Sequence, residues 1–260
     1  MEIVSIGREL LRGRVSDTNG AWLAEWFSRR GALVHRMVVV DDTERAVTSA
    51  VAEALQRGTH LVLTTGGLGP AVDDRTLAAV ADALHLPLAV QPAARDLVES
   101  AYVRLERQKK VSRGGMTAAR EKMAALPVGS EPVPNPMGIA PGMLARLPGG
   151  GAVLCLPGAP EEMRATFEEA VPRLRDLAPR GAVAQREVET PTADESALRP
   201  LLERLSAEYP DIWVQSRPAE PGRREARSRV TLEAVAPTKN EAESVVETAL
   251  RRLLALAAGA

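Results

Sequence analysis

The sequence of 260 residues contains one cysteine and three histidines, and only 3% of its residues are aromatic. A single cysteine, Cys155, excludes an internal disulfide and any zinc or iron–sulfur site built from several cysteines. The histidines are scattered at His35, His60 and His85, which argues against a metal site made of imidazoles. A bound metal would therefore be held by carboxylates and would be a hard ion such as Mg²⁺.

The sequence also lacks an excess of charge of one sign and lacks long apolar runs. The chain has 33 basic and 34 acidic side chains, a net charge of −1, so it has no general attraction for nucleic acid or an anionic membrane. No window approaches the roughly 18 apolar residues that span a bilayer, and the first residues do not form a targeting signal. We therefore expect a cytoplasmic protein with no nucleic-acid partner and no membrane partner.

Strand-like and helix-like segments alternate through about the first 175 residues. Apolar runs predict strands at 2–6, 33–40, 60–65, 142–147 and 152–156. Amphipathic patterns predict helices at 18–30, 43–57, 74–84, 92–108 and 160–174. This alternation is typical of an α/β fold with three layers, in which helices cover both faces of a mostly parallel sheet.

The pattern changes after a short linker at 177–181. Strands are predicted at 184–190, 211–217 and 228–236, with helices at 196–208 and after Thr238. Thr238 and Glu241 have capping-box spacing, and Pro200 is expected in or near the first turn of its helix. We therefore predict two domains, 1–177 and a small α+β domain at 182–260.

The strongest local signal is the glycine-rich segment 64–74. It leaves a buried strand and enters a helix, where an open α/β sheet binds ligands, and backbone N–H groups at such a point favour phosphate. The segment matches neither the P-loop nor the dinucleotide fingerprint. Its consecutive carboxylates, Asp73 and Asp74, would repel a phosphate unless a divalent cation bridged them. Alternatively, the glycines form a tight turn and the aspartates cap the next helix.

A second acidic pair, Asp41 and Asp42, follows the second predicted strand. In a parallel sheet this pair lies on the same edge as the glycine-rich segment. The alternative is that Asp42 or Thr43 is the N-cap of the helix at 43–57.

Four motifs resemble those of the CinA (competence/damage-inducible protein A) family, within the MoaB/MogA-like molybdopterin-binding superfamily. Gly7–Gly13 and Asp17–Asn19 are similar to the family patterns G-T-E-L-L-x-G and D-T-N, and Gly66–Asp74 is similar to G-G-L-G-P-T-x-D-D. Asn135–Gly142 matches the pattern N-P-x-G-x-A-P-G, and Leu156–Met163 matches L-P-G-V-P-x-E-M. The last 80 residues resemble the KH-like domain of CinA proteins through Glu195–Leu198. The third CinA domain, a deamidase, has no counterpart in these 260 residues, so a deamidase is expected, if at all, as a separate partner protein.

The resemblance implies a set of site residues. Asp41 and Asp74 would be catalytic, and Asp41, Asp73 and Asp74 would handle a divalent metal, Mg²⁺ or similar. Ligand or phosphate contacts would come from Gly7, Arg8, Glu9, Thr65, Gly66, Gly67, Leu68, Gly69, Asn135, Gly138, Pro157 and Gly158.

Three positions depart from the family pattern. Arg8 and Ala71 each stand where the family usually has a threonine, and Ala159 replaces a serine of similar proteins. Arg8 could compensate for a lost hydroxyl by binding phosphate, or it could be an ordinary solvated arginine.

The resemblance implies a divalent-metal-dependent nucleotide pyrophosphatase that acts on ADP-ribose or a related dinucleotide, in a homo-oligomer (dimer or trimer). The alternative is a non-catalytic module that binds molybdopterin or a nucleotide, which the departures at Arg8 and Ala71 favour. RNA binding by the KH-like domain is disfavoured because residues 182–260 contain no G-x-x-G loop and no positive excess.

Overall fold

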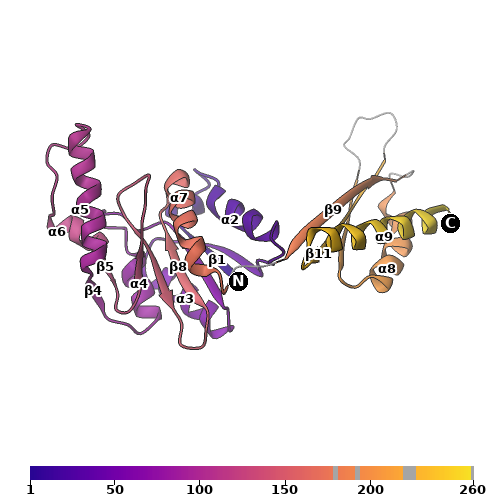
Figure 1. Ribbon diagram of the computed structural model, residues 1–260, viewed down its shortest axis with the longest axis horizontal. Coiled ribbons are helices and arrows are strands. Elements are labelled where there is room, and N and C mark those ends of the chain that lie inside the picture. Colours follow the sequence, from indigo (N-terminus) through magenta and orange to yellow (C-terminus); the bar gives the residue numbers. More distant parts are fainter. Residues whose placement is uncertain (178–180, 191–193, 219–226, 259–260) are drawn as a thin grey trace. The chain divides into compact units, whose positions relative to one another are not determined.

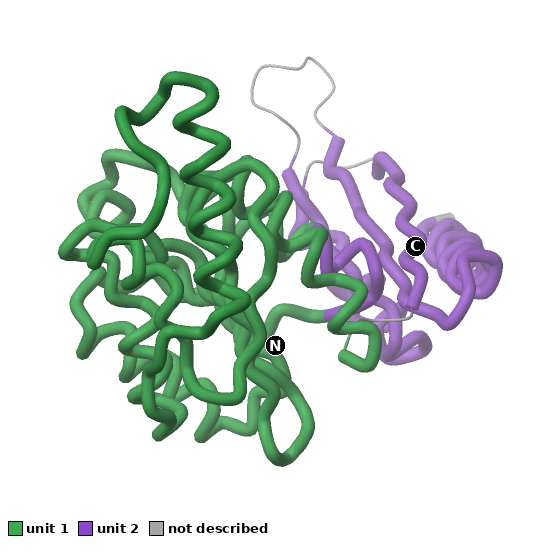
Figure 2. The backbone as a smooth tube through the Cα atoms, turned by 60° about the vertical axis from the view of Figure 1, so that its left-hand side comes forward, with its two compact units in different colours: residues 1–25, 33–178 green, residues 26–32, 179–260 purple. Residues whose placement is uncertain are grey.

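The computed structural model describes residues 1–177, 181–190, 194–218 and 227–258. The chain divides into two compact units, one of residues 1–25 and 33–178 and one of residues 26–32 and 179–260 (Figure 2). Residues 178–180 of the predicted linker lie outside the described residues.

The first unit is built on a six-stranded sheet of order β2-β1-β3-β8-β7-β6 (Figure 1). Its strands are β1 (Glu2–Ile6), β2 (Arg36–Val40), β3 (Leu61–Thr65), β6 (Glu131–Val133), β7 (Gly142–Arg146) and β8 (Ala152–Leu156). The pairs β1–β2, β1–β3 and β3–β8 are parallel, whereas β6–β7 and β7–β8 are antiparallel. The predicted α/β class with a mostly parallel sheet is confirmed.

Helices cover both faces of this sheet. Val4 of β1 belongs to a core cluster with Val47 and Val51 of helix α3 (Glu44–Gln56). On α2 (Thr18–Ser28), Trp22 packs edge-on against Phe167 of α7 (Pro160–Ala170), with 5.7 Å between ring centroids. Every residue of β1, β3 and β8 is buried, as expected for strands enclosed by two helical layers.

Several short elements were not predicted from the sequence. They are α1 (Arg8–Leu11), β4 (Leu88–Val90), α6 (Ala118–Glu121), η1 (Lys122–Ala124), β5 (Ala125–Pro127) and β6. The last four residues of the helix predicted at 160–174 form a separate 3₁₀ turn, η2 (Val171–Leu174). Strands β4 and β5 pair antiparallel beside α4 (Thr76–Ala83) and α5 (Pro92–Arg107) (Figure 1).

The second unit has an antiparallel sheet of order β10-β11-β9. Its elements are β9 (Ala182–Glu189), α8 (Glu195–Glu208), β10 (Ile212–Arg217), β11 (Arg229–Ala236) and α9 (Lys239–Ala258). The capping box of α9 is confirmed, since the Thr238 N–H donates to Glu241 and the Glu241 N–H donates to Thr238 Oγ1. Helix α8 begins at Glu195, one residue earlier than predicted, and Asp194 caps it. Pro200 is its sixth residue, just past the first turn.

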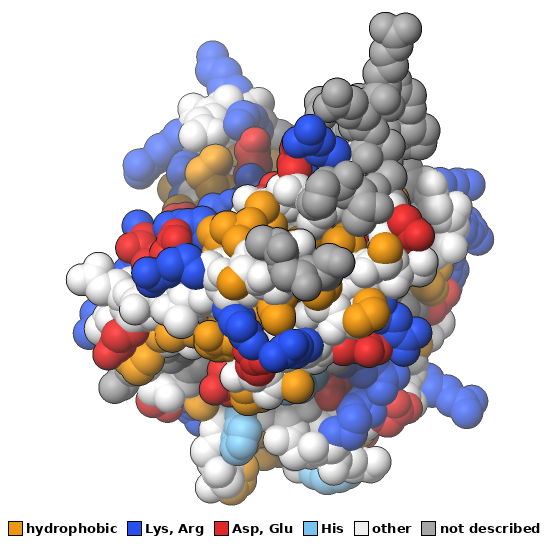
Figure 3. Space-filling model, turned by 90° about the vertical axis from the view of Figure 1, so that its right-hand side faces the viewer, with side chains coloured by type: hydrophobic (Ala, Val, Ile, Leu, Met, Phe, Trp, Pro, Cys, Tyr) orange, Lys and Arg blue, Asp and Glu red, His pale blue; other side chains and the backbone are white. Residues whose placement is uncertain are grey.

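Two observations bear on partners. No helix in the described ranges is long and apolar enough to cross a membrane. On the face drawn in Figure 3, basic and acidic side chains are interspersed, and the described residues there form no basic stripe.

A charged pair anchors the start of the sheet. Glu2 is 4% exposed and accepts two hydrogen bonds from Arg57, at 2.9 and 2.7 Å, and one from Thr59 Oγ1 at 2.7 Å. The Arg57 guanidinium therefore lowers the pKa of Glu2 from 4.5 to about 2.

Glu2→Gln is expected to reduce the free energy of unfolding at neutral pH by about 2 kcal/mol, since Arg57 is partly exposed and the pair is partly screened. The folded pKa lies below the unfolded one, so the wild-type advantage is complete above about pH 4.5 and disappears as pH falls toward about 2. Urea unfolding of both proteins across this range tests the prediction. A difference that does not change with pH would contradict it.

Candidate functional site

The parallel strands bring four chain segments to one edge of the sheet. Ile6 pairs with Val40, Ser5 with Thr65, and Thr65 with Leu156. The segments that follow these strands begin at Gly7, Asp41, Gly66 and Pro157, so they meet at the carboxyl edge where α/β sheets bind ligands.

A cavity of about 240 Å³ lies at this edge. Its lining residues are Ile6, Gly7, Glu9, Leu10, Val15, Ser16, Asp17, Thr18, Asn19, Asp42, Thr65, Gly66, Gly67, Asp73, Asp74, Gly158 and Pro160.

Gly66 and Gly67 form one wall of the cavity, and their backbone has a conformation that only glycine adopts easily. Their φ angles are +103° and +70°. A Cβ on Gly66 would lie 2.4 Å from the carbonyl oxygen of Ile6, and one on Gly67 would lie 2.2 Å from Thr76 Oγ1. Buried Thr76 fixes the loop, because its hydroxyl donates to the Gly66 carbonyl at 2.8 Å and its N–H to the Gly67 carbonyl at 3.1 Å.

One residue of this loop that lines the cavity, Gly67, has an unused backbone donor: within the described residues, its N–H donates to no protein acceptor. Asp74 Oδ2 accepts from the Ala71 N–H at 2.8 Å, and Lys122 donates to the Ala71 carbonyl. One oxygen of Asp74 thus fastens the loop. The alternative in which the aspartates cap the next helix is wrong, because Arg75 is the N-cap residue of α4 and no side chain accepts a capping hydrogen bond there.

Asn19 forms another part of the cavity wall. It is 8% exposed, and its Nδ2 group donates to the Gly158 carbonyl at 2.7 Å. Its buried Oδ1 has no hydrogen-bond donor among the described residues. Both carboxylate oxygens of the neighbouring Asp17 already accept hydrogen bonds within the protein. Oδ2 accepts from Ser5 Oγ at 2.6 Å, and Oδ1 accepts from the Gly20 N–H at 2.9 Å.

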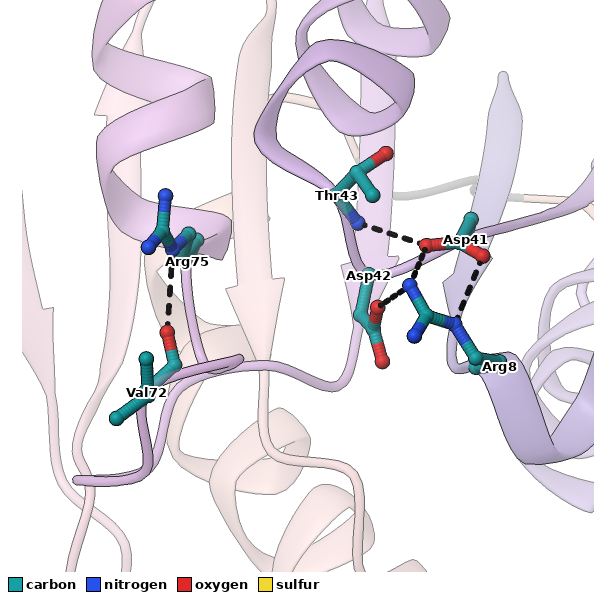
Figure 4. Close-up of polar contacts among 6 residues, drawn as sticks. All are labelled: Arg8, Asp41, Asp42, Thr43, Val72 and Arg75. Atoms are coloured by element: carbon teal, nitrogen blue, oxygen red, sulfur yellow. Dashed lines mark hydrogen bonds and ion pairs between the residues drawn. The ribbon is translucent and has the colours of Figure 1, made fainter.

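Arg8 lies between the two carboxylates of the first acidic pair (Figure 4). Its Nε and Nη2 donate to the two oxygens of Asp41 at 3.0 and 2.8 Å, and Nη2 is 3.1 Å from Asp42 Oδ1. The Thr43 N–H also donates to Asp41 Oδ1, at 3.1 Å. The guanidinium lowers the pKa of Asp41 to about 2, whereas burial and the adjacent Asp41 raise that of Asp42.

The carboxylates do not fit a preformed metal centre at Asp41. Both oxygens of Asp41 are occupied by Arg8, and one of them also accepts from Thr43. In the described part of the chain, no three acidic, histidine or cysteine side chains are grouped to hold a metal together. The metal set of Asp41, Asp73 and Asp74 stays a prediction from the resemblance.

The cavity gathers many of the predicted site residues: Gly7, Glu9, Thr65, Gly66, Gly67, Asp73, Asp74 and Gly158. Others do not line it: Arg8, Asp41, Leu68, Gly69, Asn135, Gly138 and Pro157. Leu68 is buried in the apolar core, and Arg8 borders a neighbouring hollow with Asp73.

Asn135 and Gly138 do not line the cavity and instead hold a turn together. Asn135 Nδ2 donates to the Ala140 carbonyl at 2.9 Å and to Glu162 at 2.7 Å, and its Oδ1 accepts from the Gly138 N–H at 2.8 Å. These bonds fasten the turn between β6 and β7 to helix α7.

Sequence reasoning missed Asp17, Thr18, Asn19 and Thr76 as site residues. The D-T-N motif was a usable signal for the first three. Thr76 had none, because a threonine early in a helix is common and its contact depends on how the glycine loop folds back.

Comparison with known proteins identifies the family. A family model described as "Probable molybdopterin binding domain" matches residues 2–176. The chain belongs to this family. The matched range contains every residue of the cavity described above.

Relatives of this family member span nearly the whole chain. A protein of Pyrobaculum calidifontis is 38% identical over 256 residues, covering 98% of this chain and 94% of its own length. One of Aeropyrum pernix is 40% identical over 255 residues, covering 96% and 91%.

Among solved structures, the protein CinA of Thermoplasma acidophilum, described as having unknown function, is 31% identical with a TM-score of 0.59. The match covers 66% of this chain and 97% of that one. The resemblance to CinA is thereby confirmed for this part of the chain.

Gly66→Ala is expected to lower the free energy of unfolding by about 3 kcal/mol or more, because it combines positive-φ strain with overlap on the backbone of β1. Gly58→Ala is the matched control: Gly58 also has positive φ, but its Cβ would meet nothing within 4 Å. The control should lose about 1 kcal/mol. Equal losses in urea unfolding would contradict the close approach of Gly66 to β1.

Proposed function

We propose that this family member binds, in the cavity at the carboxyl edge, a small molecule that carries a phosphate and a nitrogen heterocycle, a pterin or a nucleotide. The observation that carries the proposal is Asn19, which lines the cavity and whose buried Oδ1 has no hydrogen-bond donor among the described residues. A buried acceptor without a donor is costly, and a ligand N–H group would remove that cost by drawing the Asn19 Oδ1 toward the cavity. The amino groups of pterins and adenines are such donors.

The glycine loop supports the phosphate part of the proposal. The Gly67 N–H donates to no acceptor in the described part of the chain, and Gly67 lines the cavity. Glycine at this position lets the ligand approach the backbone closely. Free backbone donors at such a turn are suited to phosphate oxygens.

The volumes of the cavity and of the hollow beside it indicate how the ligand would lie. A cavity of about 240 Å³ is smaller than the roughly 300–1,000 Å³ typical of small-molecule sites. A hollow of about 520 Å³ adjoins it, and both are bordered by Asp42 and Asp73. The cavity would hold one end of an elongated ligand and the hollow the other.

Hydrolysis of ADP-ribose is the second candidate, and it derives from the resemblance. The observation in its favour is that Asp42, Asp73 and Asp74 all line the cavity. It rests on a divalent metal that the pairing of Asp41 with Arg8 does not favour, so we place binding first.

Calorimetric titration with ADP-ribose and with a phosphorylated pterin precursor of molybdopterin tests the binding function. We expect saturable binding of one of them, weakened about tenfold or more by Asn19→Leu, which removes the buried acceptor. The matched control is Asn135→Leu, since Asn135 is also buried but its Oδ1 is satisfied by Gly138. Failure of the wild type to bind either compound, or equal weakening by both variants, would refute the proposal.

Release of AMP from ADP-ribose, measured with Mg²⁺, Mn²⁺ or Co²⁺ present, separates the two functions. We expect binding without turnover. Should AMP form, Asp74→Asn should abolish its release while keeping an acceptor for the Ala71 N–H. Turnover that depends on Asp74 would select the hydrolytic function and overturn our ranking.

A further inference from the structure

Arg8 makes contacts that a metal ion would make at an acidic pair. Its guanidinium binds Asp41 through two parallel hydrogen bonds, at 3.0 and 2.8 Å, and reaches Asp42 at 3.1 Å. This fork geometry is specific to arginine and gives direction as well as charge. Figure 4 shows the guanidinium between the two carboxylates, with Asp41 also held by the Thr43 N–H.

The charges explain why a cation is needed at this position. Asp41 and Asp42 are consecutive, and Asp73 is close enough to add to the field at Arg8. Two adjacent carboxylates facing an anionic ligand would repel it unless a positive charge stood between them. Arg8 supplies that charge permanently, because a guanidinium does not lose its proton in proteins.

Part of the guanidinium remains available. In the described part of the chain, Arg8 Nη1 has no acceptor, whereas Nε and Nη2 are used by the acidic pair. The Arg8 side chain is 46% exposed and borders the hollow of about 520 Å³ next to the cavity. The Nη1 group can therefore donate to an anion in that hollow while the rest of the guanidinium stays on Asp41.

We propose that Arg8 is the resident cation of this site: it links the Asp41–Asp42 pair to the phosphate of the ligand, and it replaces a divalent metal at Asp41. The ligand assignment rests on the proposed function, but the exclusion of metal from Asp41 does not. The site then binds its anionic ligand equally well without divalent metal.

Arg75 offers a matched control for this proposal. It borders the same hollow, but its Nε donates to the Val72 carbonyl at 3.1 Å and its Nη1 lies 3.7 Å from Glu44. Its removal changes the net charge as much as removal of Arg8 does, without freeing Asp41.

The first arm of the test uses Mn²⁺ alone, with the free ion followed by electron paramagnetic resonance. We expect no stoichiometric Mn²⁺ binding by the wild type or by Arg75→Gln. Arg8→Gln should bind Mn²⁺ at least about tenfold more tightly, and the added Asp41→Asn substitution should remove that gain. Wild-type binding that is lost in Asp41→Asn, or no gain in Arg8→Gln, would overturn the proposal.

The second arm measures ADP-ribose binding in chelator and in millimolar Mg²⁺. The wild-type dissociation constant should differ by less than about twofold, and Arg8→Gln should weaken binding about tenfold in chelator. A wild type that binds only with Mg²⁺ would contradict the role of Arg8. If neither ADP-ribose nor the phosphorylated pterin precursor binds under any condition, the proposed function fails while the Mn²⁺ arm still decides whether Arg8 excludes metal. If only the pterin binds, the same comparison is made with the pterin. Thermal melts of all variants show whether each one is folded, and Arg8→Ala replaces Arg8→Gln in both arms if Arg8→Gln does not fold.

Discussion

The site depends on the parallel pairing of β1 with β2 on one side and β3 on the other. This register places the ends of the three strands side by side, so the residues after Ile6, Val40 and Thr65 share one edge. Arg8 can reach Asp41 across 33 positions of sequence only because of that pairing. The glycine loop is subject to the same constraint, since Gly66 passes too close to the Ile6 carbonyl to carry a side chain.

This edge combines fixed backbone donors with several carboxylates, and the balance between them determines its chemistry. The loop donors favour an anion, while Asp42, Asp73 and Asp74 disfavour one. A divalent metal could neutralise the carboxylates so that an anion can bind, and an internal guanidinium could do the same. We propose that the pairing of Arg8 with Asp41 is the second solution.

Much of the fold could be predicted from sequence because long apolar strands and amphipathic helices carry a clear periodicity. The missed elements, such as β4, β5 and α1, are three or four residues long and too short to show one. The acidic pairs and the glycine loop were found from local chemistry, and their common edge follows from parallel strands. The partner of Arg8, the hydroxyl of Thr76 and the unpaired Oδ1 of Asn19 could not be predicted, because each depends on tertiary contacts between segments distant in sequence.

We propose that the Arg8 guanidinium, and not a metal, occupies the acidic pair. Nuclear magnetic resonance of the arginine side-chain Nε–H groups observes this contact directly. We expect a slowly exchanging Arg8 signal that disappears in Asp41→Asn and is unchanged by Mg²⁺. A signal that Mg²⁺ shifts, or that Mn²⁺ broadens at stoichiometric concentration, would show a metal at Asp41 and contradict the claim.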